Sequence, residues 1–172
     1  MSAKQILLLL LMSTGIMACS KDESEETPTA ITVVINELMP KNSTTQADQD
    51  GEYDDWIELY NTTGTSIDLS GYFLSDSKKN ITKWKFPQGT TITAKGYLII
   101  WADGDTLQSG LHTNYKLSAE GEKMVLATPE QTIIDQMSYP AQAEELSYAR
   151  VPDGTGEFVW QAPTYNATNG KK

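Results

Sequence analysis

The chain is divided into short β-branched or alternating apolar runs, and turn residues separate each run from the next. No stretch after residue 20 keeps a helical period long enough for a main helix, whereas short alternating runs are typical of half-buried strands. The pattern therefore predicts an all-β domain over residues 31–170, built as an antiparallel sandwich or barrel. The expected strands are Ile31–Leu38, Trp56–Tyr60, Gly71–Ser75, Lys83–Phe86, Thr90–Thr93, Tyr97–Trp101, Lys123–Ala127, Thr132–Met137, Ser147–Val151 and Phe158–Trp160.

The balance of charged and metal-binding residues excludes several classes of function. Lys and Arg number 13 against 23 Asp and Glu, which gives a net charge of −10. Affinity for nucleic acids depends on neutralising phosphates with Lys and Arg, so neither DNA nor RNA is an expected partner. The single histidine, His112, and the single cysteine, Cys19, cannot supply a zinc site of three or four His/Cys ligands or a disulfide framework within one chain.

Residues 1–18 have the pattern of a secretory signal peptide, with a positive N-terminus, the apolar run Ile6–Met12 and then small residues. The apolar run is too short to span a bilayer. The last three residues of this segment and the cysteine after it, Ile16–Cys19, read Ile-Met-Ala-Cys and resemble the lipobox of bacterial lipoproteins. That resemblance implies cleavage before Cys19 and a membrane anchor of several acyl chains on this cysteine.

The segment that follows the cysteine indicates where the mature protein is displayed. Residues 19–30 are charged and rich in Ser and Thr, which predicts an acidic, disordered linker. Within it, Lys21–Glu23 reads Lys-Asp-Glu and resembles the export signal on surface lipoproteins of Bacteroidetes-type bacteria. We therefore expect an outer-membrane lipoprotein displayed on the cell surface.

Several short blocks of sequence occur in a characteristic order. They are Val34–Met39, Asp55–Asn61, Ile67–Asp76, Trp84–Pro87, Gly89–Thr90, Ile92–Leu98, Gly121–Glu122, Ala149–Gly154 and Pro163–Asn166. In this combination they resemble the lamin-tail domain (LTD) family over roughly residues 31–170. The resemblance implies an immunoglobulin-like antiparallel β-sandwich that serves attachment or interaction and not catalysis. We therefore expect a non-enzymatic adhesion or interaction module whose partner is an envelope protein or a glycan. The alternative is a carbohydrate-binding surface component stabilised by calcium.

The segment 48–55 carries the richest cluster of acidic side chains. Alternating oxygen ligands around a central glycine suit Ca²⁺, which prefers hard oxygen ligands. The segment is not an EF-hand, because the twelfth position of such a loop would be Leu59 and not a bidentate Glu. A solvated acidic loop is the alternative interpretation, and no other cofactor is expected. The candidate calcium ligands are Asp48, Asp50, Glu52, Asp54 and Asp55.

Three acidic residues, Glu37, Glu58 and Asp76, lie within the blocks that carry the resemblance. Acids inside strands are expected to be buried polar groups that accept hydrogen bonds from backbone N–H groups of loops. The alternative is a paired-carboxylate active site such as that of a glycosidase, which needs two carboxylates at a defined separation across a groove. The structural role is the prediction, and no catalytic residue is assigned.

The isolated histidine offers little for catalysis. His112 has no second histidine beside it, and Ser109, Asp103 and Asp105 are too close in sequence to make a convincing catalytic triad. A surface or loop-structuring role is therefore predicted for His112.

The aromatic residues suggest one candidate for ligand stacking. Trp84 lies between Lys83 and Lys85, which predicts that it is the most exposed of the four tryptophans. An exposed indole could stack on a glycan, and the alternative is that it packs in the core or across strands. Trp84 is therefore the candidate ligand-binding residue.

Overall fold

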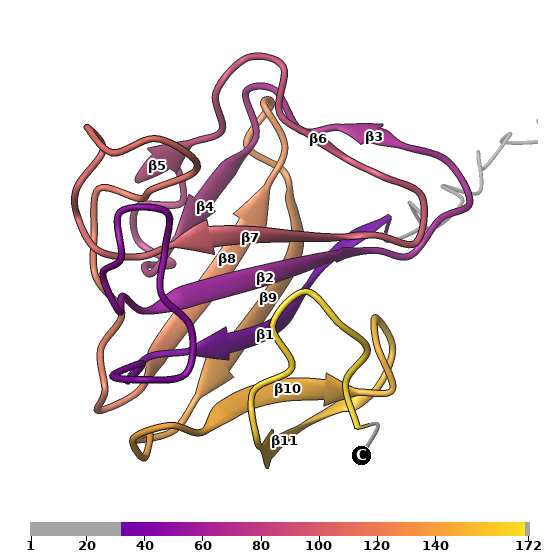
Figure 1. Ribbon diagram of the computed structural model, residues 1–172. Helices are drawn as coiled ribbons and strands as arrows, with labels where there is room; N and C mark the ends of the chain where they lie inside the picture. The colour runs from indigo at the N-terminus through magenta and orange to yellow at the C-terminus, as the bar shows by residue number, and fades with distance from the viewer. Residues whose placement is uncertain (1–31, 171–172) are drawn as a thin grey trace, which may run out of the picture.

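Each predicted run coincides with a strand of the computed structural model, which describes residues 32–170 (Figure 1). The predicted bounds agree with the observed strands within two residues at either end. An eleventh strand, β3, lies outside the predicted runs. Among the described residues no helix is long and apolar enough to cross a membrane. The leader, Cys19 and the linker predicted for residues 1–30 lie outside the described residues.

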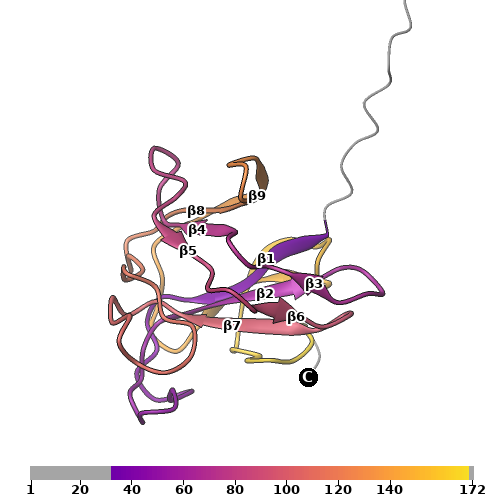
Figure 2. The same cartoon turned by 90° about the horizontal axis from the view of Figure 1, so that it is seen from above.

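The strands form two facing antiparallel sheets and one small ribbon, which Figure 2 shows as layers. The larger sheet has the order β11 (Glu157–Gln161), β10 (Ser147–Val151), β1 (Val33–Met39), β2 (Trp56–Asn61) and β7 (Tyr97–Trp101). The opposite sheet has the order β5 (Trp84–Lys85), β4 (Phe73–Ser75), β8 (Glu122–Ala127) and β9 (Ile133–Tyr139). The ribbon pairs β3 (Ile67–Asp68) with β6 (Thr91–Ile92).

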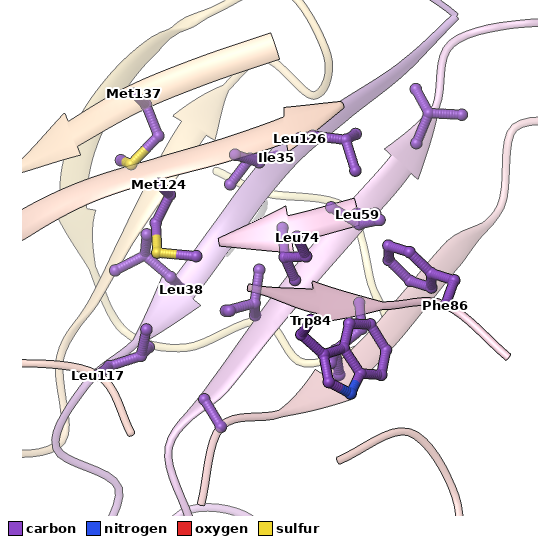
Figure 3. Packing of buried hydrophobic residues seen from close by; sticks show 14 of the residues in the cluster. Ile35, Leu38, Leu59, Leu74, Trp84, Phe86, Leu117, Met124, Leu126 and Met137 are labelled. Carbon is purple, nitrogen blue, oxygen red and sulfur yellow. The ribbon is translucent and has the colours of Figure 1, made fainter. Parts of the chain in front are cut away.

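The core lies between the two sheets because alternate residues of each strand point inward. On β2, Ile57 and Leu59 belong to this core, whereas Trp56 and Glu58 point to the other face of the sheet. Figure 3 shows the side chains that fill the space between the layers. The labelled ones are Ile35, Leu38, Leu59, Leu74, Trp84, Phe86, Leu117, Met124, Leu126 and Met137. The expected immunoglobulin-like β-sandwich is confirmed.

A β-bulge at Asn36 changes the alternation of β1. The register to β2 shifts between Ile35 and Glu37, so Asn36 is an extra residue without a partner. As a result, Ile35 and Leu38 both face the core although they are three residues apart. Glu37 is turned to the outer face, where it lies opposite Glu58 of β2.

The outer face of the larger sheet is covered by the segment after β11, which crosses β1 and β2 in Figure 1 (yellow). The Tyr165 ring of this C-terminal segment, residues 162–170, lies 5.5 Å from the Trp56 ring and 5.9 Å from the Trp101 ring. With Met39 these rings form a second apolar cluster, so the middle strands of the larger sheet are buried on both faces.

Candidate functional site

Two buried carboxylates lie side by side on the outer face of the larger sheet. Glu37 and Glu58 are paired across β1 and β2, and both are fully buried. Glu37 accepts hydrogen bonds from the backbone N and the Oγ1 of Thr164, at 3.0 and 2.7 Å. Glu58 accepts hydrogen bonds from the backbone N of Asn166 at 2.8 Å and from Nδ2 of Asn36 at 3.1 Å. All four carboxylate oxygens are therefore bonded to the chain's own donors.

The surroundings of these carboxylates raise their pKa values. Burial is the main cause of the raised pKa of Glu58, which reaches about 8, and the charges of Glu37 and Asp153 add to it. Burial also raises the pKa of Glu37, although its hydrogen bonds to neighbouring polar groups oppose the shift. The hydrogen bonds of this pair hold the C-terminal segment on the sheet.

The third predicted acid, Asp76, lies elsewhere. It follows β4 in the smaller sheet and makes an ion pair with Lys83. The structure therefore separates Asp76 from the Glu37–Glu58 pair.

The acidic segment 48–55 brings three of its five candidate ligands together. Carboxylate oxygens of Asp48, Glu52 and Asp54 lie within 4.8 Å of one another. Asp50 and Asp55 belong to neither of the two groups of side chains that could hold a metal ion among the described residues. Oδ2 of Asp48 and Oδ2 of Asp54 are shielded from solvent and have no hydrogen-bond partner.

The segment also carries unfavourable like charges. Burial is the main cause of the raised pKa of Asp54, and the charges of Asp103, Asp48 and Glu52 raise it further. Burial likewise raises the pKa of Asp55 to about 6. A divalent cation would relieve both the repulsion and the unpaired oxygens, and the oxygen donors suit Ca²⁺.

For His112 the sequence predicts a surface or loop-structuring role. The structure buries His112, so the surface alternative is wrong. Its Nδ1 lies 2.6 Å from Oδ2 of Asp103, and its Nε2 lies 3.1 Å from the carbonyl oxygen of Ser109. These contacts tie the loop after β7 to itself, which is the loop-structuring role that the sequence predicted. Asp48 lies beside the pair, and its carboxylate is within 4.8 Å of both side chains. The turn between Asp103 and His112 allows their contact, and the contact of Ser109 with the imidazole is made by its backbone oxygen and not by its hydroxyl.

The prediction that Trp84 is exposed is wrong. Trp84 is 7% exposed, and its ring packs edge-on against Phe86 at 4.7 Å in the core (Figure 3). The flanking lysines do not indicate an exposed Trp84, because alternation along a strand points Trp84 away from the face that its neighbours share. The exposed tryptophan is Trp160 on the edge strand β11, which is 41% exposed.

Trp160 belongs to a row of rings on the β10–β11 hairpin. Tyr148 lies opposite Trp160 in the register, with ring centroids 5.3 Å apart. Tyr148 also stacks on Phe158, at 5.4 Å with an angle of 16° between the rings. The guanidinium carbon of Arg150 lies 4.5 Å from the centre of the Phe158 ring. We call these four side chains the aromatic row.

A cavity of about 340 Å³ lies at the Arg150 end of the aromatic row. Nη2 of Arg150 lies 3.1 and 3.2 Å from the two carboxylate oxygens of Asp135 on β9. This volume is at the lower end of the range for small-molecule sites. The residues that line the cavity are Val34, Thr62, Asp135, Arg150, Gly154 and Thr155.

A family model described as Lamin Tail Domain matches residues 26–141. The match ends before β10 begins, so it does not include the aromatic row or the C-terminal segment. No curated protein matches the chain.

Proposed function

This chain belongs to the Lamin Tail Domain family, and on that basis we propose that it is a non-enzymatic adhesion or interaction module of the cell envelope. The family suggests a β-sandwich that serves interaction. The observation that carries the proposal is that Glu37 and Glu58, the acids best placed for catalysis, are occupied by the chain's own hydrogen-bond donors. Their carboxylates hold the C-terminal segment on the larger sheet, so neither is open to a substrate.

The same proposal includes an outer-membrane location at the cell surface. It is supported by the lipobox-like motif before Cys19 and by the Lys-Asp-Glu tripeptide behind it. A lipid on Cys19 and the acidic linker would hold the domain near the membrane and present its surfaces to an envelope protein or a glycan.

Replacing the proposed lipidation site should release the protein from the membrane. We expect Cys19→Ala to move the full chain from the membrane pellet to the soluble fraction, because no acyl chains would then anchor it. Ser20→Ala is the matched control and should stay in the pellet. Fractionation followed by immunoblotting measures this. A Cys19→Ala protein that sediments with the membrane as wild type does would refute the anchor.

The second candidate is a carbohydrate-binding surface component stabilised by calcium. Exposed Trp160 favours the carbohydrate part. The calcium part is supported by the grouping of Asp48, Glu52 and Asp54 and by the two unpaired carboxylate oxygens among them. Cation binding there would hold the loop before β2 in one conformation, because all three ligands come from that loop.

Calcium should raise the melting temperature of the protein. A ligand at 100 times its dissociation constant adds about 2.7 kcal/mol to the free energy of unfolding, which is a shift of several degrees for a domain of this size. Asp54→Asn should abolish the difference between Ca²⁺ and EDTA, whereas Asp50→Asn should keep it because Asp50 lies outside the cluster. Identical melting curves of wild type in EDTA and in excess Ca²⁺ would eliminate the calcium site.

A further inference from the structure

The aromatic row lies where the larger sheet extends past its partner sheet. Tyr148 is paired with Leu38, a core residue of β1, so the row is on the face that points toward the smaller sheet. Asp135, on the outermost strand of the smaller sheet, contacts β1 through the backbone N of Ile35 and β10 through Arg150. β11 is the edge strand beyond β10, and its Trp160 remains exposed.

The row continues directly into the cavity. Arg150 is shared by both, since it stacks on Phe158 and also lines the cavity. Beyond Arg150 lie the rings of Phe158, Tyr148 and Trp160 in that order. Their centroids are 5.4 Å apart from Phe158 to Tyr148 and 5.3 Å apart from Tyr148 to Trp160. The whole is a recess with a mostly apolar lining and two charged side chains, Asp135 and Arg150, followed by a line of rings that ends at an exposed indole. This combination orients ligands through a few polar groups and binds them through apolar and aromatic surface.

The polar groups of the recess favour a ligand without charge. The charge of Arg150 is neutralised by Asp135, whose side chain is 9% exposed, and the chain as a whole has a net charge of −10. An anion would meet an unfavourable overall potential, and a cation would compete with Arg150 for the same carboxylate. Arg150 also donates to the backbone oxygens of Ile35 and Gly156, so a ligand meets only the remaining N–H groups of the guanidinium and the second lone pairs of the carboxylate. Hydroxyl groups both donate and accept hydrogen bonds, so vicinal hydroxyls match donors and acceptors that lie side by side.

We propose that the cavity and the aromatic row bind a neutral saccharide chain. One sugar unit lies in the cavity with its hydroxyls against Asp135 and Arg150, and the following units lay their apolar C–H faces on Tyr148 and Trp160. A peptide that added a strand to the edge of β11 would instead use backbone groups and would leave these ring faces free. The inference rests on the proposed interaction role and names the class of partner.

The three other tryptophans are buried, which makes Trp160 a specific reporter. Trp56, Trp84 and Trp101 are at most 7% exposed. Quenching of tryptophan fluorescence by acrylamide therefore acts mainly on Trp160 in the full-length protein. Saturating polysaccharide should reduce this quenching if sugar units cover the indole. The probes are a β-1,4-glucan, an α-mannan and a galactan, with alginate as an anionic comparison.

Affinity electrophoresis of the full-length variants in the same polysaccharides gives the affinity. We expect at least one neutral polysaccharide to retard wild type, and Trp160→Ala to weaken binding about tenfold or more, because Trp160 offers the most exposed ring of the row and aromatic side chains often carry much of the binding energy. Val159→Ala is the matched control, because Val159 is also 41% exposed but points to the opposite face of β11. It should bind as wild type does. Thr155→Phe, on the rim of the cavity, should weaken binding without lowering the melting temperature.

Two results would overturn the saccharide inference. In the first, none of the three neutral polysaccharides retards the wild-type protein or reduces the acrylamide quenching of its tryptophan fluorescence. In the second, the Trp160→Ala variant binds a neutral polysaccharide as tightly as the Val159→Ala variant does. Retardation in alginate only would show that the ligand is anionic and would equally contradict the assignment. None of these outcomes bears on the membrane anchor, because the fractionation of Cys19→Ala tests that part of the proposed function separately.

Discussion

Raising the pH from 5 to 9 should destabilise the folded protein by several kcal/mol, because folding buries Glu58 in a site that favours its protonated form. The pKa of Glu58 rises from 4.5 to about 8 on folding, with burial as the main cause and the charges of Glu37 and Asp153 as further causes. A group whose pKa is raised in the folded state binds protons more strongly there. Its contribution to stability is therefore complete below pH 4.5 and is lost as the pH rises through 8.

The size of this effect follows from the shift. A rise from 4.5 to about 8 corresponds to at most about 5 kcal/mol, since each pKa unit is equivalent to about 1.4 kcal/mol. Burial raises the pKa of Glu37 as well, so the second carboxylate of the pair changes stability in the same direction. The C-terminal segment, which is bonded to both, should be the first part to loosen.

Urea unfolding of wild type and Glu58→Gln at pH 5, 7 and 9 measures this dependence. Glutamine carries no charge at any of these pH values, so the variant should lose much less stability than wild type between pH 5 and pH 9. Glu144→Gln is the control, because Glu144 is exposed on a loop, and it should follow the wild-type curve. A wild-type free energy of unfolding that stays constant or rises over this range would contradict the buried, protonated glutamate.

Trp56→Ala should produce the largest loss of stability among single substitutions in the second apolar cluster. Trp56 is fully buried, and its ring meets Tyr165 of the C-terminal segment edge-on at 5.5 Å. Truncating a buried tryptophan to alanine removes its transfer free energy and leaves a cavity, which typically costs about 3–5 kcal/mol. The loss would also remove the surface on which the C-terminal segment packs.

The matched control for this substitution is Trp160→Ala. The same chemical change at the exposed edge strand should cost less, about 2 kcal/mol, because Trp160 is 41% exposed and keeps part of its contact with water in the folded state. Urea midpoints of both variants at pH 6 allow a direct comparison. Equal losses at the two positions would mean that the C-terminal segment does not cover Trp56 in solution.

The strands could be predicted because a half-buried strand requires alternation, and alternation is visible in sequence. On β2 the pattern placed Ile57 and Leu59 on one face, and the structure has both in the core. The same rule could have placed Trp84 inward, since its lysine neighbours occupy the alternate positions. The bulge at Asn36 gave no such signal, because an extra residue only becomes apparent against the partner strand.

The sites depend on contacts between distant parts of the chain. Glu58 accepts a hydrogen bond from Asn166, which is 108 residues away, and Arg150 meets Asp135 across the two sheets. The alternation of apolar residues and the order of the short blocks by themselves determined the all-β sandwich and the family. Only the tertiary structure decided which acids are bonded to the C-terminal segment, which tryptophan meets solvent and where the cavity lies. Burial and long-range pairing arise from the packing of whole sheets, and no local pattern specifies that packing.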